Sequence, residues 1–147
     1  VKVDRTRTPQ KALDATGRKQ YTDRKVVDSM PKGEGEEVEL SLFKLDLSDR
    51  NGQISDDELE KEFELRDLIP DPYALSALNE VDPAFADTHP NGTHWKDADG
   101  KWCFALFYQW LDVERRVNVD RGDDDWGGDW FFAGVRKPKS SALAPKA

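Results

Sequence analysis

Residues 93–107 read THWKDADGKWCFALF and decide the fold class of this 147-residue chain. A turn at 97–100 separates two extended segments, and the second continues to Trp110 with apolar side chains on both faces. One face carries Trp102, Phe104, Leu106, Tyr108 and Trp110, and the other carries Cys103, Ala105 and Phe107. The stretch therefore predicts a β-hairpin whose second strand is covered on both sides.

Three more segments have the composition of strands. Residues 38–47 begin in strict alternation and become apolar on both faces, which favours a central strand. Residues 115–120 and 130–135 supply Val- and Phe-rich segments at the C-terminal side. We expect these strands to form a small antiparallel sheet, with one strand near 38–47 and the others between 93 and 135.

Helix signals lie between these strands. Ser55 and Glu58 have the spacing of a capping box and predict a helix that ends near Leu68. The pairs Asp71-Pro72 and Asp82-Pro83 each place an acidic cap before a proline, so each predicts the start of another helix. The fold class is therefore α+β, with two or three short helices between residues 55 and 88.

Charge is distributed unevenly along the chain. Residues 1–35 carry a net charge of +4, residues 36–135 carry −16, and residues 136–147 carry +4, which together give the net charge of −8. We expect a basic, partly ordered N-terminal arm at 1–35, a single acidic domain at 36–135, and a basic tail at 136–147 that is rich in Lys, Pro and Ala.

Composition excludes several classes of protein. The sequence has no apolar run long enough to span a bilayer, and its first thirty residues do not have the pattern of a signal peptide. The single cysteine, Cys103, cannot form a disulfide within the chain. We therefore expect a cytoplasmic protein that makes no membrane contact.

The charge pattern suggests three kinds of partner. The basic ends could fold back onto the acidic body, reach a second copy, or contact nucleic acid. A body with a charge of −16 repels phosphate, so contact with nucleic acid is expected through the terminal arms alone. We favour a protein partner or self-association.

One loop resembles the calcium-binding loop of an EF-hand. Asp49, Asn51 and Glu58 stand at oxygen-donor positions of that motif, and the resemblance implies Ca²⁺ as a ligand. The first donor position, however, is Leu47, which has no side-chain oxygen. A turn followed by a capping box produces the same letters, and we favour that interpretation.

A second acidic cluster lies on a glycine-rich stretch near the C-terminus. It contains Asp120, Asp123, Asp124, Asp125 and Asp129. Carboxylates on such a loop could hold Ca²⁺ or Mg²⁺, with Asp120, Asp124 and Asp129 as ligands, and could serve a metal-dependent hydrolase. The alternative, which we favour, is a solvated loop between two strands.

The aromatic and histidine residues give weaker signals. All five tryptophans lie between residues 95 and 130, and Trp95 and Trp126 stand beside turns, so these two are expected to be exposed. His89 and His94 lack the spacing of a zinc site and are interpreted as surface residues of a turn.

The sequence therefore favours an interaction protein over an enzyme. Its acidic body would dock a basic partner or another copy through Trp95, Trp126, Asp123, Asp124 and Asp125, with the basic ends as latches. A metal-dependent hydrolase and a nucleic-acid contact are the alternatives, and no catalytic residue or cofactor is assigned.

Overall fold

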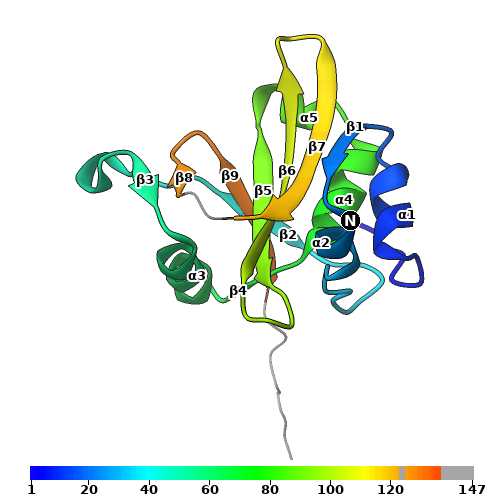
Figure 1. Ribbon diagram of the computed structural model, residues 1–147, viewed down its shortest axis with the longest axis horizontal. Coiled ribbons are helices and arrows are strands. Elements are labelled where there is room, and N and C mark those ends of the chain that lie inside the picture. The colour runs from blue at the N-terminus through cyan, green and yellow to red at the C-terminus, as the bar shows by residue number, and fades with distance from the viewer. Residues whose placement is uncertain (123–124, 137–147) are drawn as a thin grey trace, which may run out of the picture.

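The computed structural model describes residues 1–122 and 125–136. Five α-helices, one 3₁₀ helix and nine strands lie within them (Figure 1). The helices are α1 (Pro9–Asp14), α2 (Arg24–Asp28), α3 (Asp56–Leu65), α4 (Pro72–Val81), α5 (Phe85–Thr88) and the 3₁₀ helix η1 (Ser48–Arg50). The strands are β1 (Lys19–Thr22), β2 (Leu40–Phe43), β3 (Gln53–Ile54), β4 (Leu68–Pro70), β5 (Asn91–Lys96), β6 (Trp102–Trp110), β7 (Glu114–Arg121), β8 (Trp126–Gly127) and β9 (Phe131–Arg136).

Seven strands form one mixed sheet in the order β1-β7-β6-β5-β9-β2, and β4 also pairs with β9. The predicted hairpin is present as β5–β6, with Trp95 opposite Cys103. The α+β class is confirmed. The prediction of a small antiparallel sheet is only partly correct, because the sheet has seven strands and is mixed: β1 runs parallel to β7 and β5 runs parallel to β9. The sequence KQYT of β1 has no apolar alternation to mark it as a strand, and its backbone pairing with β7 supplies what the pattern lacks.

Two apolar cores lie on opposite faces of the sheet. Helices α1, α2 and α4 cover one face, and α3 lies on the other side together with the small β3–β8 ribbon (Figure 1). Cys103, Ala105 and Phe107 of β6 belong to the first core, whereas Phe104 and Leu106 pack against the second. The predicted alternation of β6 is therefore confirmed.

The N-terminal segment is more firmly docked than expected. Leu13 and Val27 are fully buried in the first core, and Val26 and Met30 are almost completely buried. These apolar residues are separated by charged ones, so the linear sequence conceals the face that they form. The expectation of a partly docked arm at 1–35 is corrected accordingly, and the tail at 137–147 lies outside the described residues.

Several boundaries also differ from expectation. The capping box of Ser55 and Glu58 is present, and Asp71 caps α4 as predicted. Asp82 instead ends α4, and the next helix begins at Phe85. The strand expected at 38–47 is limited to β2, Leu40–Phe43. Leu45 and Leu47, which follow it, pack in the second core instead of extending the strand. No helix in the described ranges is long and apolar enough to cross a membrane.

Candidate functional site

The two tryptophans expected at the surface are buried. Trp95 is 5% exposed, and its indole Nε1 donates to Ser29 Oγ at 3.0 Å. Trp126 is 6% exposed and packs edge-on against Phe132. Each tryptophan stands next to a turn in the sequence, but its side chain packs into an apolar core. Trp95 belongs to the first core and Trp126 to the second. The expectation of an exposed pair is therefore wrong.

The EF-hand interpretation fails at its essential glutamate. Glu58 Oε1 accepts from Ser55 in the capping box, and Oε2 is held by Arg50. Asn51 adopts a left-handed conformation with φ of 57°, as a turn residue does. Among the residues that the structure describes, no three His, Cys, Asp or Glu side chains are placed to hold a metal ion, and this covers Asp49 as well as Glu58.

The second acidic cluster separates in the same way. Asp123 and Asp124 lie outside the described residues. Asp129 is exposed, whereas Asp120 and Asp125 line one pocket of about 370 Å³. We call it the Asp56 pocket, and its lining consists of Asp56, Phe104, Leu106, Asp120, Arg121, Gly122, Asp125, Trp126 and Trp130.

Asp56 is the first residue of α3, directly after the capping residue Ser55, and its side chain lines the pocket. Its side chain is 9% exposed. Oδ1 accepts hydrogen bonds from His94 Nδ1 and from Trp126 Nε1, each at 2.8 Å. Within the described residues Oδ2 has no hydrogen-bond partner, and it faces Gly122, where a Cβ would approach it to 3.3 Å. The carboxylate is thus held in place through Oδ1, and within the described residues Oδ2 remains available to a ligand.

His94 holds Asp56 in place through this hydrogen bond, and its own side chain is fully buried. Its ring lies between Phe63, at a centroid distance of 5.3 Å, and Trp102, at 4.2 Å. Nδ1 faces Asp56 and Nε2 faces Glu60 Oε1 at 3.0 Å. A neutral imidazole has only one N–H, so it is the doubly protonated ring that donates to both carboxylates.

The pKa of His94 agrees with this arrangement. Burial opposes the charged ring, but hydrogen bonds to Asp56 and Glu60 and the charges of those carboxylates outweigh it, so the pKa of His94 is raised above its ordinary value. The three groups together carry one negative charge. The interpretation of His94 as a surface residue of a turn is therefore wrong.

Aromatic side chains form the walls of the Asp56 pocket. Trp126 meets Phe104 at 6.2 Å and Trp130 at 6.0 Å, with both pairs nearly perpendicular. Asp120 and Asp125 are exposed at the rim, and Arg121 is held by Asp97 at 3.2 Å. Among the described residues, the pocket therefore combines aromatic surfaces with three carboxylates and one cationic side chain, Arg121, which is already paired.

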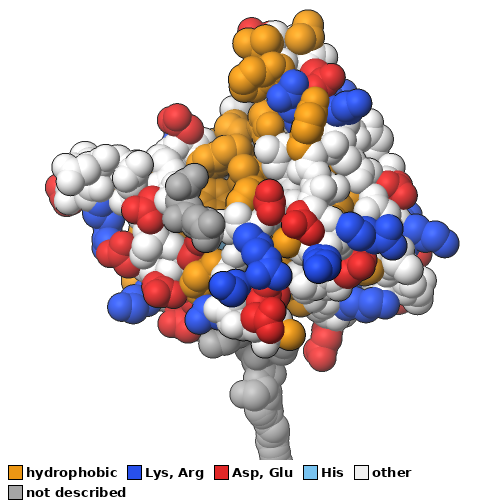
Figure 2. All heavy atoms as spheres, viewed as in Figure 1, with side chains coloured by type: hydrophobic (Ala, Val, Ile, Leu, Met, Phe, Trp, Pro, Cys, Tyr) orange, Lys and Arg blue, Asp and Glu red, His pale blue; other side chains and the backbone are white. Residues whose placement is uncertain are grey.

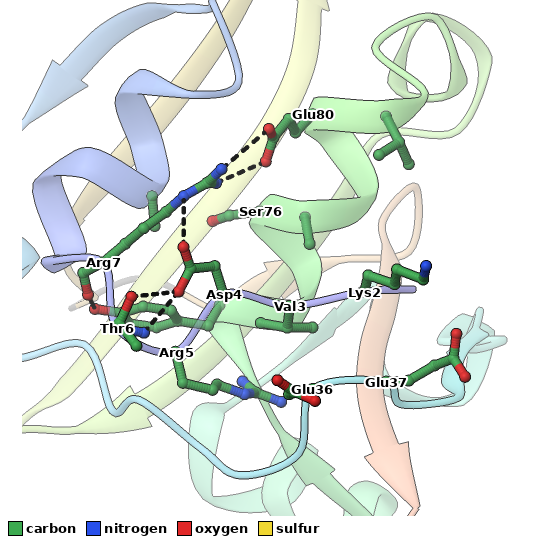
Figure 3. A pocket seen from close by; sticks show the side chains of 14 residues that line it. Lys2, Val3, Asp4, Arg5, Thr6, Arg7, Glu36, Glu37, Ser76 and Glu80 are labelled. Carbon is green, nitrogen blue, oxygen red and sulfur yellow. Dashed lines mark hydrogen bonds and ion pairs between the residues drawn. The ribbon is translucent and has the colours of Figure 1, made fainter.

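Two other pockets are occupied in part by interactions within the chain itself. A pocket of about 730 Å³ lies between the N-terminal segment and α4 (Figure 3). Three of its charged groups pair with each other, since Arg7 binds Glu80 at 2.8 Å and approaches Asp4 at 3.7 Å. Bases expected to latch onto a partner therefore hold the N-terminal segment in place.

A further pocket of about 720 Å³ lies on the Glu60 side of His94. Lys96 places its Nζ 4.9 Å from the Trp102 ring centroid, so a cation of the chain itself already lies against this aromatic side chain. Asp57, the neighbour of Asp56 in α3, accepts from Trp102 Nε1 at 2.8 Å and lines this second pocket.

Sequence reasoning missed the centre of the site. No role is assigned to Asp56 or Glu60 from the sequence. No local pattern links residues 56, 94 and 126, which the sheet and α3 bring together. No protein family, curated protein or solved structure matches this chain.

Proposed function

We propose that this chain is a protein-interaction module that binds a cationic side chain, lysine or arginine, of a basic partner in the Asp56 pocket. The observation that carries the proposal is Asp56, a nearly buried carboxylate in the lining of an aromatic pocket, whose Oδ2 accepts no hydrogen bond from any residue that the structure describes. A cation there gains both the charge of Asp56 and the negative faces of the rings.

Preorganisation supports this choice of ligand. Two hydrogen bonds to Oδ1 hold Asp56 in place before any partner arrives, so binding does not have to immobilise it. The same carboxylate would repel a phosphate or a carboxylate ligand. Asp120 and Asp125 extend this preference to the rim.

The charge of the whole chain acts in the same direction. The net charge of −8 attracts a basic surface over long range and raises the rate of encounter. The bases of the N-terminal segment do not oppose this contact at the site, because Arg5 and Arg7 are paired with Asp71 and Glu80. Nucleic acid is the disfavoured partner for the same electrostatic reason.

The test is a titration of the full chain with two short peptides, one containing a single arginine and one a single lysine, followed by NMR. We expect shifts at the indole N–H signals of Trp126 and Trp130. Asp56→Asn should weaken binding at least tenfold, because it removes the charge that faces the pocket. Asp57→Asn is the matched control, since it removes the same charge one residue away on the other side of α3.

A second variant keeps the test valid if Asp56→Asn unfolds the chain. Trp130→Leu removes a half-buried wall of the pocket, and it should weaken binding of both peptides. The proposal fails if a peptide with glutamate binds as well as one with arginine, or if Asp57→Asn weakens binding as much as Asp56→Asn does.

A further inference from the structure

A second carboxylate has an oxygen without a partner, and it lies elsewhere in the molecule. Asp71 caps α4, and its side chain is 2% exposed. Oδ1 accepts from Ala74 N at 3.0 Å and from Arg5 Nη1 at 2.8 Å. Oδ2 is buried and has no hydrogen-bond partner among the residues that the structure describes. Buried carboxylate oxygens are seldom left unpaired, so this atom calls for a donor.

Most of the N–H groups of Arg5 are already used. Besides its bond to Asp71 Oδ1, Arg5 donates to the carbonyl oxygens of Lys32 at 2.8 Å, Glu34 at 2.8 Å and Gly35 at 3.0 Å, and so holds the loop over Asp71. Four of its five N–H groups are therefore engaged, and no donor in the described part of the chain bonds to Oδ2.

Asp71 belongs to the wall of a pocket of about 470 Å³ at one end of the sheet. We call it the Asp71 pocket, and its lining consists of Gly33, Glu34, Val38, Glu39, Ile69, Pro70, Asp71, Val135 and Arg136. It shares no residue with the Asp56 pocket. Four of its walls are aliphatic, and none is aromatic, so its chemistry suits an alkyl chain rather than a planar ring.

Charge defines the other half of the ligand. The pocket and its edge carry three carboxylates, Glu34, Glu39 and Asp71, against the two guanidinium groups of Arg5 and Arg136. Among the described residues of the site, one negative charge is left over. A ligand with a single positive charge would neutralise the site, and a ligand with a negative charge would double the imbalance.

Gly33 packs close to Asp71 Oδ2. A Cβ on this residue would lie 2.9 Å from Oδ2, and its φ of 66° also favours glycine. Gly33 is exposed and lines the pocket. Because Oδ2 is buried, a ligand in the pocket reaches it only if the surrounding residues move.

We propose that the Asp71 pocket binds a primary alkylammonium group, with its nitrogen at Asp71 Oδ2 and its alkyl chain against Ile69 and Val135. A free aliphatic amine and a lysine side chain share this chemistry. The chain itself has lysines at 137 and 139, directly after the pocket residue Arg136.

The experiment is an NMR titration of the full chain with pentylammonium, and with 1-pentanol as the neutral probe of the same length. We expect pentylammonium to shift the amides of Gly33, Ile69 and Val135 and to bind at least tenfold more tightly than pentanol. Asp71→Asn should abolish this difference. Asp23→Asn is the matched control, because Asp23 is also a helix cap but lies exposed at the start of α2.

Two further variants complete the design. Ile69→Ser changes a partly exposed wall and should weaken pentylammonium more than methylammonium, which tests the alkyl contact even if Asp71→Asn unfolds. Replacing Lys137 and Lys139 with glutamine in the full chain should tighten amine binding several-fold if these lysines compete for the site. An unchanged affinity, together with binding of Nα-acetyl-lysine N-methylamide, which keeps its side-chain ammonium group, points to lysine from another protein.

The inference is overturned if pentanol binds as tightly as pentylammonium, if Asp71→Asn leaves binding intact, or if the shifted amides lie outside the pocket. Because the two pockets share no residue, failure here leaves the Asp56 pocket untouched. The converse also holds, since the peptides that test the Asp56 pocket are scored on its two indole signals.

Discussion

At the scale of the residue, His94 links the candidate site to the stability of the fold. The buried, charged ring bridges Asp56, which is nearly buried, and Glu60, which is partly exposed. Without the ring, the Asp56 carboxylate would be left without a cation in a nearly buried position, which is costly. Because the pKa of His94 is raised on folding, this contribution is fully present below the ordinary pKa of histidine. It is lost as the pH rises through the higher pKa of the folded state.

Glu60→Gln tests this linkage. The variant removes one of the two carboxylates that raise the pKa of His94, so the loss of stability should begin at a lower pH than in the wild type. At pH 6 we expect a cost of about 1 kcal/mol, since the bond from His94 Nε2 then runs to a neutral amide oxygen instead of a carboxylate, at a partly exposed position. Urea unfolding between pH 5.5 and 9 measures both effects. Parallel pH curves for the two proteins would contradict the assignment.

At the scale of the element, the β6–β7 hairpin carries an avoidable strain. Leu111 and Asp112 at its tip have φ of 51° and 57°, and Leu111 is 73% exposed. Apolar side chains gather at this end of the molecule in Figure 2, where Val113 is 81% exposed. Left-handed conformations at two successive turn residues favour Asn-Gly, so Leu111 suits its backbone poorly and Asp112 is less suited than glycine.

Leu111→Asn combined with Asp112→Gly should therefore stabilise the chain by about 1 kcal/mol, since the turn loses its steric conflict and little apolar contact. Thermal unfolding measures the gain. Ala98→Asn in the β5–β6 turn is the control, because no positive φ is found at that residue and no gain is expected there. A loss of stability in the double variant would show that the exposed Leu111 packs against something in the folded state.

Elements also differ in how far the sequence announces them. The capping box of Ser55 and the alternation of β6 are local patterns, and both predictions are confirmed. The parallel pairing of β1 with β7 joins segments about a hundred residues apart, for which no periodicity exists. The Asp56 pocket could be predicted only in part, for the same reason. Asp125 and Trp126 are neighbours in the sequence and are named there as candidate binding residues, whereas Asp56 and His94 join them only through tertiary contacts.

At the scale of the whole molecule, charge and burial give different answers about where the fold begins. The net charge of +4 set residues 1–35 apart from the acidic body, but charge concerns the surface and says little about the core. The burial of Leu13, Val26 and Val27 makes this segment part of the first core, and β1 closes one edge of the sheet. The domain that folds therefore includes the N-terminal segment.

Removal of residues 1–35 should therefore unfold the chain rather than release an arm. Each large aliphatic side chain lost from a core costs about 2–5 kcal/mol, so the loss of Leu13, Val26 and Val27 together would consume most of the stability of a domain of this size. Circular dichroism and amide proton dispersion of the truncated chain measure the outcome. The full chain with Arg24→Gln, a change to an exposed base of the same segment, is the control and should remain folded. A truncated chain with native dispersion would instead restore the view of 1–35 as a dispensable arm, free to act as a latch.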